Sequence, residues 1–174
     1  MYFFTADQHF GHPSIIENCA RPFSSIIEMN EEIIKRHNEV VSNNDIVIHA
    51  GDMTFKKSFQ ETQKYVKQLK GQNIFLIGSH DSWLKGMRSS YIWEKMIEDK
   101  YVVVCHYAMK TWPRSHYNSW QLYGHSHGRL DPVGKQWDIG VDNNNFYPVS
   151  FEQLKEIMKN RLDNFNSITK IYDK

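Results

Sequence analysis

The side chains that could carry chemistry in this chain are aspartates and histidines grouped in five short clusters. The clusters are Asp7-Gln8-His9, Gly51-Asp52, Gly78-Ser79-His80-Asp81, His106 and Gly124-His125-Ser126-His127. Aspartate and histidine are ligand types that suit manganese, iron or zinc. Each cluster except the last directly follows, or ends, a short apolar run, so we expect side chains that project from strand ends toward one site. A single Asp-x-His or Gly-Asp pair is usually turn chemistry, but five such clusters in one order indicate a metal site.

A pair of metal ions about 3.5–4 Å apart would suit such a ligand set and would favour hydrolysis of a phosphate ester. The ions neutralise charge on the phosphate oxygens and lower the pKa of a bound water from about 15.7 toward ~7. A carboxylate shared by both ions would hold them at that distance. We assign this role to Asp52, because it follows the apolar run Ile46–His49 and a glycine that permits close approach of the backbone.

The size and composition of the chain fit one domain, residues 1–174, with an ordinary core. Hydrophobic residues make up 40% and charged residues 24%. The net charge of +1 provides no basic surface for long nucleic acid. The longest apolar runs, such as Ile74–Ile77, are too short to cross a bilayer. Two cysteines, Cys19 and Cys105, form no disulfide framework, so we expect a cytoplasmic protein without a membrane partner.

Hydrophobic periodicity predicts alternating strands and helices in the first half of the chain and mostly strands in the second half. We predict strands at Tyr2–Ala6, Ile46–His49, Ile74–Ile77, Tyr101–Cys105, Gln121–Tyr123 and Gln136–Val141. We predict helices at Met29–Val41, from Ser58 to Leu69, and from a Ser150 capping box to about Leu162. Parallel βαβ units followed by hairpin-like strands favour two packed mixed sheets with helices outside. The polar residues 163–174 should form a peripheral tail.

The clusters resemble the pattern of calcineurin-like metallophosphoesterases, which is Asp-x-His, Gly-Asp, Gly-Asn-His-Asp/Glu, His and Gly-His-x-His. The match extends from Asp7 to His127. The chain is also similar to small bacterial and phage members of this family. They share the segments Asp7–His12, Arg21-Pro22-Phe23, Met29-Asn30-Glu31, Gly140-Val141-Asp142 and Tyr147-Pro148-Val149. The resemblance implies an α/β fold in which two facing mixed β-sheets are flanked by helices.

The resemblance also implies roles for individual residues. The first metal site would consist of Asp7, His9, Asp52 and His127, and the second of Asp52, Ser79, His106 and His125. The catalytic residues would be Asp52 and His80, a non-ligand histidine that protonates the leaving oxygen or steadies the transition state. Asp81 fills the acidic position after it. The expected cofactors are two divalent ions, with Mn²⁺ the first choice and Fe, Zn²⁺ or Ni²⁺ as alternatives.

Ser79 departs from the family pattern, which has asparagine at this position. An asparagine amide oxygen is a good neutral ligand for a hard cation, whereas a serine hydroxyl is shorter and a weaker donor. We therefore expect a weaker second metal site and reduced activity. The sequence leaves open whether this serine is natural or an engineered change that traps substrate.

The residues around the motifs favour a phosphodiester as substrate. Protein phosphatases of the family carry an arginine soon after the Gly-Asp motif, and here Asp52 is followed by Met53-Thr54-Phe55-Lys56-Lys57. Tyr107 and Trp112 follow a proposed ligand closely enough to stack on a base, and an arginine could pair with the phosphate. Core packing is the alternative for Trp112. The candidate substrate contacts are His12, Arg21, Tyr107, Trp112 and Arg114.

The function that we expect is hydrolysis of a small linear or cyclic nucleotide by a hydroxide activated between two metals. Two alternatives stay open at this point. One is a catalytically weakened fold that binds a phosphorylated ligand or a partner protein, which the serine at position 79 suggests. The other is a phosphomonoesterase. The physiological metal, the exact substrate and the oligomeric state are not determined by the sequence.

Overall fold

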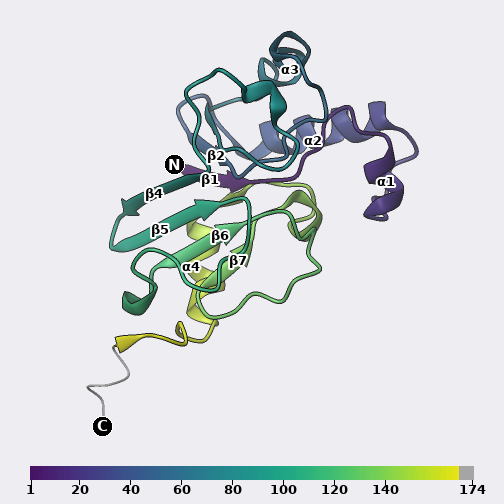
Figure 1. Ribbon diagram of the computed structural model, residues 1–174. Coiled ribbons are helices and arrows are strands. Elements are labelled where there is room, and N and C mark those ends of the chain that lie inside the picture. Colours follow the sequence, from purple (N-terminus) through teal and green to yellow (C-terminus); the bar gives the residue numbers. More distant parts are fainter. Residues whose placement is uncertain (169–174) are drawn as a thin grey trace.

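The computed structural model describes residues 1–168 and contains two four-stranded sheets that face each other (Figure 1). The strand orders are β3-β2-β1-β8 and β4-β5-β6-β7. The strands are β1 Tyr2–Thr5, β2 Ile46–His49, β3 Gln72–Phe75, β4 Ile92–Ile97, β5 Lys100–Cys105, β6 Trp120–Tyr123, β7 Gln136–Asp138 and β8 Val149–Ser150. The α-helices are α1 Ser14–Asn18, α2 Ile26–Val40, α3 Phe59–Val66 and α4 Phe151–Lys159. The predicted α/β fold of two facing mixed sheets flanked by helices is confirmed.

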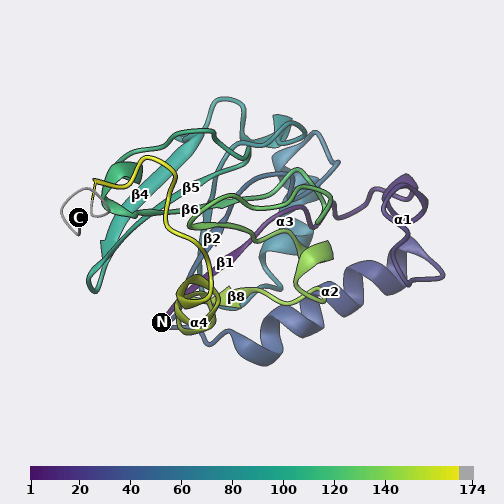
Figure 2. The same cartoon turned by 90° about the horizontal axis from the view of Figure 1, so that it is seen from below.

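The main core lies between the two sheets. Phe4 and Ile48 of the first sheet and Val102 and Leu122 of the second are fully buried in one cluster, which Leu154 of α4 joins. A second cluster on the opposite face of the first sheet is formed by α2 and the loops around it. Figure 2 shows α2 along this outer side and α4 next to β8. The first sheet is therefore covered on both faces, which fits its parallel β1, β2 and β3.

Side-chain caps start the helices where the sequence indicates them. Ser58 accepts a hydrogen bond from the backbone N–H of Glu61 at the start of α3, and Ser150 forms the predicted capping box with Gln153. The predicted ends differ by a few residues, since α3 and α4 stop earlier than expected and α2 begins earlier, after its cap Ser25. End positions are set by tertiary contacts that periodicity does not contain.

The strand predictions need four corrections. β3 spans Gln72–Phe75 instead of the predicted Ile74–Ile77, because the polar residues Gln72 and Asn73 of this edge strand pair with β2. β4, an exposed edge strand, was missed, and so was the two-residue β8. β7 ends at Asp138, and a 3-10 turn, Val141–Asn143, follows it.

The sequence suggested a series of hairpins in the second half of the chain, but the second sheet does not have this arrangement. Only β4 and β5 form an antiparallel hairpin, whereas β5, β6 and β7 are parallel. Residues 106–119 and 124–135 serve as the crossovers, and segments of this length can connect parallel strands. Parallel strands bring their carboxyl ends to one edge, so the residues that follow β5 and β6 meet there.

The expected peripheral tail is anchored to the fold in its first part. Asn164 is fully buried, and its side-chain amide donates hydrogen bonds to the backbone carbonyls of Ser115 and Ser119. Asn166 also donates to the Ser115 hydroxyl. Asn164 and Ser167 are buried, whereas Phe165 is 64% exposed, so this part of the expected tail lies at the surface and is held there by hydrogen bonds to the loop around Ser115. Residues 169–174 lie outside the described residues.

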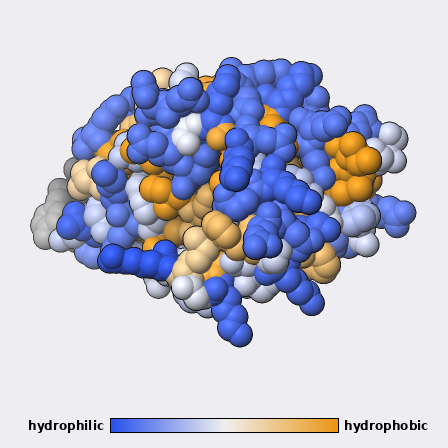
Figure 3. Space-filling view, turned by 90° about the horizontal axis from the view of Figure 1, so that it is seen from above, coloured by the Kyte–Doolittle hydropathy of each residue, from blue (hydrophilic) through white to orange (hydrophobic). Residues whose placement is uncertain are grey.

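Figure 3 shows one face on which apolar residues form separate patches between polar ones. Within residues 1–168, no helix is both long enough and apolar enough to cross a membrane.

Candidate metal centre

The first two clusters lie side by side because they follow neighbouring parallel strands. Beyond β1 and β2, the backbone N–H of Asp7 donates to Gly51 O at 3.1 Å and that of His9 donates to Asp52 O at 3.0 Å. The second sheet joins them through a bridge between Ala6 and Gly140. Carboxyl ends of strands from both sheets therefore converge at one place, the usual position of a site in open α/β sheets.

The structure brings the proposed ligands together in two groups. Asp7, His9 and His127 place ligand atoms within 4.8 Å of one another, and Asp52, His106 and His125 form a second such group. Asp52 lies between them, since its Oδ2 is 3.8 Å from His9 Nε2 and 3.3 Å from His106 Nε2. One carboxylate oxygen thus faces a histidine from each group. This is the geometry expected of a bridging ligand.

Buried polar atoms without partners show that these residues fit metal ions. Among the residues that the structure describes, Asp7 Oδ1, His9 Nε2 and His106 Nε2 are buried and make no hydrogen bond. An unpaired buried polar atom is costly, and three in one place need a common explanation. A carboxylate oxygen and two imidazole nitrogens suit a divalent transition metal. We therefore infer that they face cations.

Five of the proposed ligands have a left-handed backbone conformation. The φ angles are 60° for Asp7, 53° for His9, 54° for Asp52, 66° for His125 and 50° for His127. Residues other than glycine adopt this region rarely, and such residues cluster at functional sites. The conformation turns each side chain out of the strand direction and toward the centre.

Two glycines make room for the carboxylates. A Cβ at Gly78 would lie 2.3 Å from Asp52 Oδ1, and a Cβ at Gly124 would lie 2.6 Å from Asp7 Oδ2. Any larger residue would push the carboxylates away. This explains why glycine precedes the third and fifth clusters.

Asp81 holds the loop that carries Asp52. Its Oδ2 accepts hydrogen bonds from the backbone N–H of Asp52 at 2.6 Å and of Gly78 at 2.9 Å. Its Oδ1 accepts from the Met53 N–H and the Trp83 indole. Asp81 is itself buried and therefore acts by positioning its neighbours.

The outer nitrogens of two histidines are also held. His106 Nδ1 lies 2.9 Å from Ala50 O, a partner that requires an N–H and leaves Nε2 free as a ligand atom. His127 Nδ1 lies 2.7 Å from Asp142 Oδ2. Such outer partners fix the orientation of metal-binding histidines. The sequence identifies Asp142 only as part of a shared segment, because its role depends on a contact between distant loops.

Arg21 supports the centre from behind and does not face a substrate. It is buried, and its guanidinium forms a two-pronged ion pair with Asp142 in which both N···O distances are 2.7 Å. It also donates to the backbone carbonyls of Asp7 and Gln8. Its predicted role as a phosphate contact is corrected, because its donors are already used within the protein.

The electrostatics of the centre shift the pKa values of the proposed ligands in both directions. Burial acts to raise the pKa of Asp52, but the nearby His106 imidazole, the His80 N–H and the Ser79 hydroxyl outweigh it and lower that pKa. Burial lowers the pKa of His9 to about 3, so its imidazole is neutral. Burial raises the pKa of Asp7 to about 7. A cation beside Asp7 would replace this proton, because a metal ligand must be deprotonated.

Ser79 and His80 lie at the open side of the centre. Ser79 Oγ donates a hydrogen bond to Asp52 Oδ2 at 2.8 Å, and the His80 backbone N–H donates to Asp52 Oδ1 at 2.8 Å. The His80 side chain is 41% exposed, and its Nε2 lies 4.0 Å from Asp52 Oδ2. An exposed imidazole at this distance can meet a substrate bound over the cluster.

The structure divides the remaining candidate substrate contacts. His12 and Tyr107 lie beside the centre, since the His12 ring centroid is 5.4 Å from that of His9 and the Tyr107 centroid is 4.7 Å from that of His125. Phe55, which the sequence analysis passed over, also reaches the centre, with its ring centroid 5.5 Å from that of His80.

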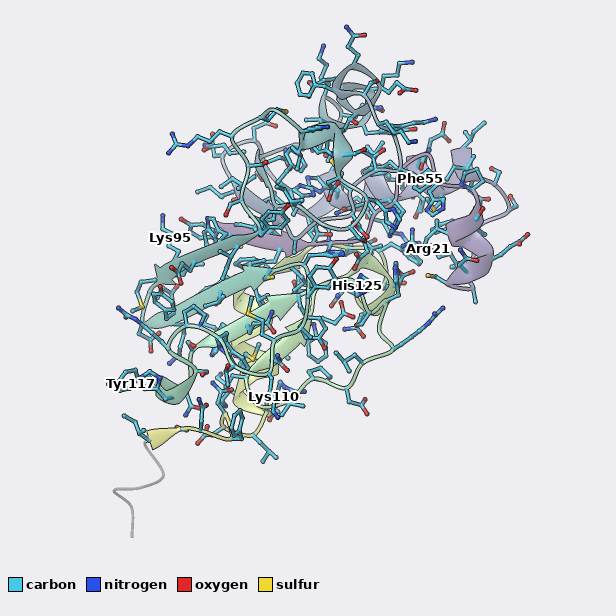
Figure 4. The ribbon with its side chains drawn as sticks, in the orientation of Figure 1. Arg21, Phe55, Lys95, Lys110, Tyr117 and His125 are labelled. Carbon is cyan, nitrogen blue, oxygen red and sulfur yellow. The ribbon has the colours of Figure 1, made fainter. Side chains whose placement is uncertain are left out.

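Trp112 and Arg114 have other contacts, and their predicted roles are corrected. Trp112 is buried, and its indole N–H donates to Ser119 O. Arg114 packs over the Tyr101 ring at 4.4 Å and adjoins the turn that contains Tyr117. In Figure 4 Tyr117 lies on the opposite side of the molecule from Phe55 and Arg21. Nearness in sequence to His106 did not bring these side chains to the centre.

Comparisons with known proteins concern the family and the fold of this chain. The family model described as calcineurin-like phosphoesterase matches residues 2–171. The uncharacterized protein MJ1445 of Methanocaldococcus jannaschii is 28% identical over an alignment of 163 residues, and the match covers 88% of this chain and 89% of that protein. The crystal structure of AQ665, a protein of unknown function from Aquifex aeolicus, has a TM-score of 0.70 at 20% identity and covers 90% of this chain and 98% of that one. At this identity the likeness concerns the fold alone.

Proposed function

This chain belongs to the calcineurin-like phosphoesterase family, and on that basis we propose that it is a phosphodiesterase acting on a small linear or cyclic nucleotide. The family implies metal-dependent hydrolysis of phosphate esters. The observation that carries the proposal is the position of Asp52, whose Oδ2 lies between His9 and His106. A carboxylate in this place can serve two ions at once.

The proposed centre has a division of labour. Asp7, His9 and His127 would hold one divalent ion, and His106 and His125 the other. Asp52 would lie between the ions, with Ser79 next to it. When bound, such a pair neutralises charge on the phosphate oxygens and lowers the pKa of a water molecule. We propose manganese as the metal because mixed carboxylate and imidazole ligands suit it, with iron, zinc or nickel as alternatives.

His80 would supply the proton that the leaving oxygen needs. Its imidazole is the exposed one of the group that it forms with His9 and Asp52. A positioned acid of this kind contributes about 10²–10⁴-fold to turnover. The hydrogen bond from the His80 backbone N–H to Asp52 Oδ1 holds its backbone in place.

A small diester fits the surroundings of the centre better than a protein or a long nucleic acid. The net charge of the chain is +1, so bulk electrostatics do not favour the binding of a long polyanion. Two exposed aromatic rings, Phe55 and Tyr107, flank the histidines and can contact a nucleobase. The two free cysteines favour a cytoplasmic location.

Hydrolysis assays on a substrate panel test the proposal. The purified protein is stripped of metal with a chelator, checked for metal content, and assayed with and without Mn²⁺ on bis(4-nitrophenyl) phosphate, 4-nitrophenyl phosphate and cyclic nucleotides. We expect turnover only with added metal and a preference for diesters. Full activity at near-zero metal content would refute the mechanism. A preference for the monoester would refute the diester assignment, and binding without turnover would favour the role of a ligand-binding protein.

A further inference from the structure

Phe55 is an exposed aromatic residue at the edge of the centre. It comes three residues after Asp52, and its backbone N–H donates to Phe10 O. Its ring stacks on that of His12, with centroids 4.1 Å apart and planes 11° apart. In spite of these contacts it is 45% exposed. A large apolar side chain thus stays open to solvent where a substrate would arrive.

The neighbours of Phe55 define the side of the substrate that it would meet. Its ring centroid is 5.5 Å from that of His80, and His12 is 6.1 Å from His80. Tyr107 instead contacts His106 and His125, at the other ion position. The two exposed rings therefore lie beside different histidines of the centre, Phe55 beside His80 and Tyr107 beside His106 and His125.

We infer that Phe55, stacked on His12 beside His80, selects a flat aromatic leaving group, such as a nucleobase-bearing or aryl alcohol. This inference rests on the proposed function, because it takes His80 as the residue that protonates the leaving oxygen. A leaving group that receives its proton there must project toward Phe55. The phenyl face stacks on any aromatic ring and offers no hydrogen bond, so it selects flatness and not a particular base.

A merely structural role for Phe55 would have different consequences. His12 Nδ1 lies 3.4 Å from His9 Nδ1. In a merely structural role, Phe55 would hold His12 against His9 and would not contact the substrate. In that case its loss would weaken metal binding and slow all substrates alike. A contact with the leaving group would instead appear only with aromatic leaving groups, and mainly in KM.

The test compares Phe55→Leu with Phe59→Leu. Phe59 is a matched control, since it is 44% exposed and lies four positions away. It begins α3, and its ring packs near that of Trp83. The substrates are methyl phenyl phosphate and methyl trifluoroethyl phosphate, which share the retained methyl group. Each variant is compared with the unchanged protein on each substrate, so the intrinsic reactivity of the leaving group cancels.

We expect Phe55→Leu to lower kcat/KM for the phenyl ester about 10-fold, mostly through KM, and to leave the trifluoroethyl ester within about twofold. Phe59→Leu should change neither, and Mn²⁺ affinity should stay the same in both variants. Phe55→Tyr should retain the preference. An equal loss on both esters, weaker Mn²⁺ binding, or no loss at all would overturn the inference.

Binding measurements separate this inference from the proposed function. The Mn²⁺-loaded protein is titrated with phenyl phosphate and with methyl phosphate by calorimetry. If the protein binds phenyl phosphate more tightly than methyl phosphate and Phe55→Leu removes that preference, Phe55 contacts the aromatic group of the ligand. Absence of hydrolysis in that case would refute the proposed function, and with it the selection of a leaving group, but not this contact. If neither ligand binds, or the preference survives in Phe55→Leu, the inference is refuted.

Discussion

Replacing Asp142 by asparagine should weaken metal binding and destabilise the fold by separate routes. Asp142 accepts three hydrogen bonds, two from Arg21 and one from His127, with donor–acceptor distances of 2.7 Å. Asparagine keeps one acceptor oxygen and presents an NH₂ group on the other side. It therefore cannot serve both partners, and it removes the charge that compensates the buried guanidinium.

The size of each effect follows from these contacts. The Arg21 side chain is fully buried and that of Asp142 is 8% exposed, and removing one partner of a buried pair costs about 3–5 kcal/mol. Arg21 keeps its bonds to Asp7 O and Gln8 O, so we expect the lower end, about 3 kcal/mol. For a chain of this length the melting temperature should fall by about 6–12 °C. Loss of the partner of His127 should weaken the first metal about 10–100-fold.

Two measurements check this prediction. Denaturant unfolding of the metal-free protein gives the stability loss, and calorimetric titration with Mn²⁺ gives the affinity. Asp131→Asn, an exposed aspartate on the loop between β6 and β7, is the matched control and should change neither. Unchanged Mn²⁺ affinity in Asp142→Asn, together with the expected stability loss, would refute the idea that this carboxylate orients His127.

Three further predictions concern the centre and the core. His80→Ala should leave the metal content nearly intact and lower turnover about 10²–10⁴-fold, whereas Asp52→Asn should lose both ions. Metal analysis after gel filtration measures the metal content of each variant. If both variants lost their metal equally, His80 would be a ligand. Ser79→Asn should increase the affinity of the second site for its ion and raise turnover at low Mn²⁺, because an amide oxygen replaces a hydroxyl that donates to Asp52. If the unchanged chain bound two ions with equal affinity and the substitution had no effect, this prediction would be contradicted. Burial lowers the pKa of His49 to about 3. The neutral His49 side chain therefore contributes its full share to the free energy of unfolding above pH 6.5, and this contribution is lost as the pH falls below 6.5. At pH 5 the loss is about 2 kcal/mol, and His49→Gln should remove that part of the pH dependence in urea unfolding; an unchanged slope would show that His49 is not its source.

Local patterns predicted the strands that carry the ligands, because an apolar run followed by Asp or Gly is visible in a few residues. β2 was predicted with the observed bounds. The parallel arrangement of β5, β6 and β7 was missed, since crossovers without helices look like hairpin loops. The proposed ligands could be identified from their order along the chain, and the structure brings them together.

The supporting residues could not be identified in the same way, because their roles depend on distant contacts and on exposure. Asp142 and Arg21 are 121 residues apart in sequence, and neither stands in a ligand motif. Trp112 and Arg114 follow His106 in sequence but turn away from it, one into the core and the other over Tyr101. Phe55 follows Asp52 and turns toward the centre. Sequence position alone gave no means of separating these cases.

The left-handed backbone at the proposed ligands limits how this centre could be moved into another protein. Five residues in this conformation cost on the order of 1 kcal/mol each, a sum comparable to the whole stability of a small domain. The same side chains placed on ordinary strands or helices would point in other directions. A designer who wished to graft the centre would have to carry over the loops after β1, β2 and β6, with Gly78 and Gly124, and a host fold stable enough to hold them. The unit that can be transplanted is thus a set of turns anchored at a sheet edge.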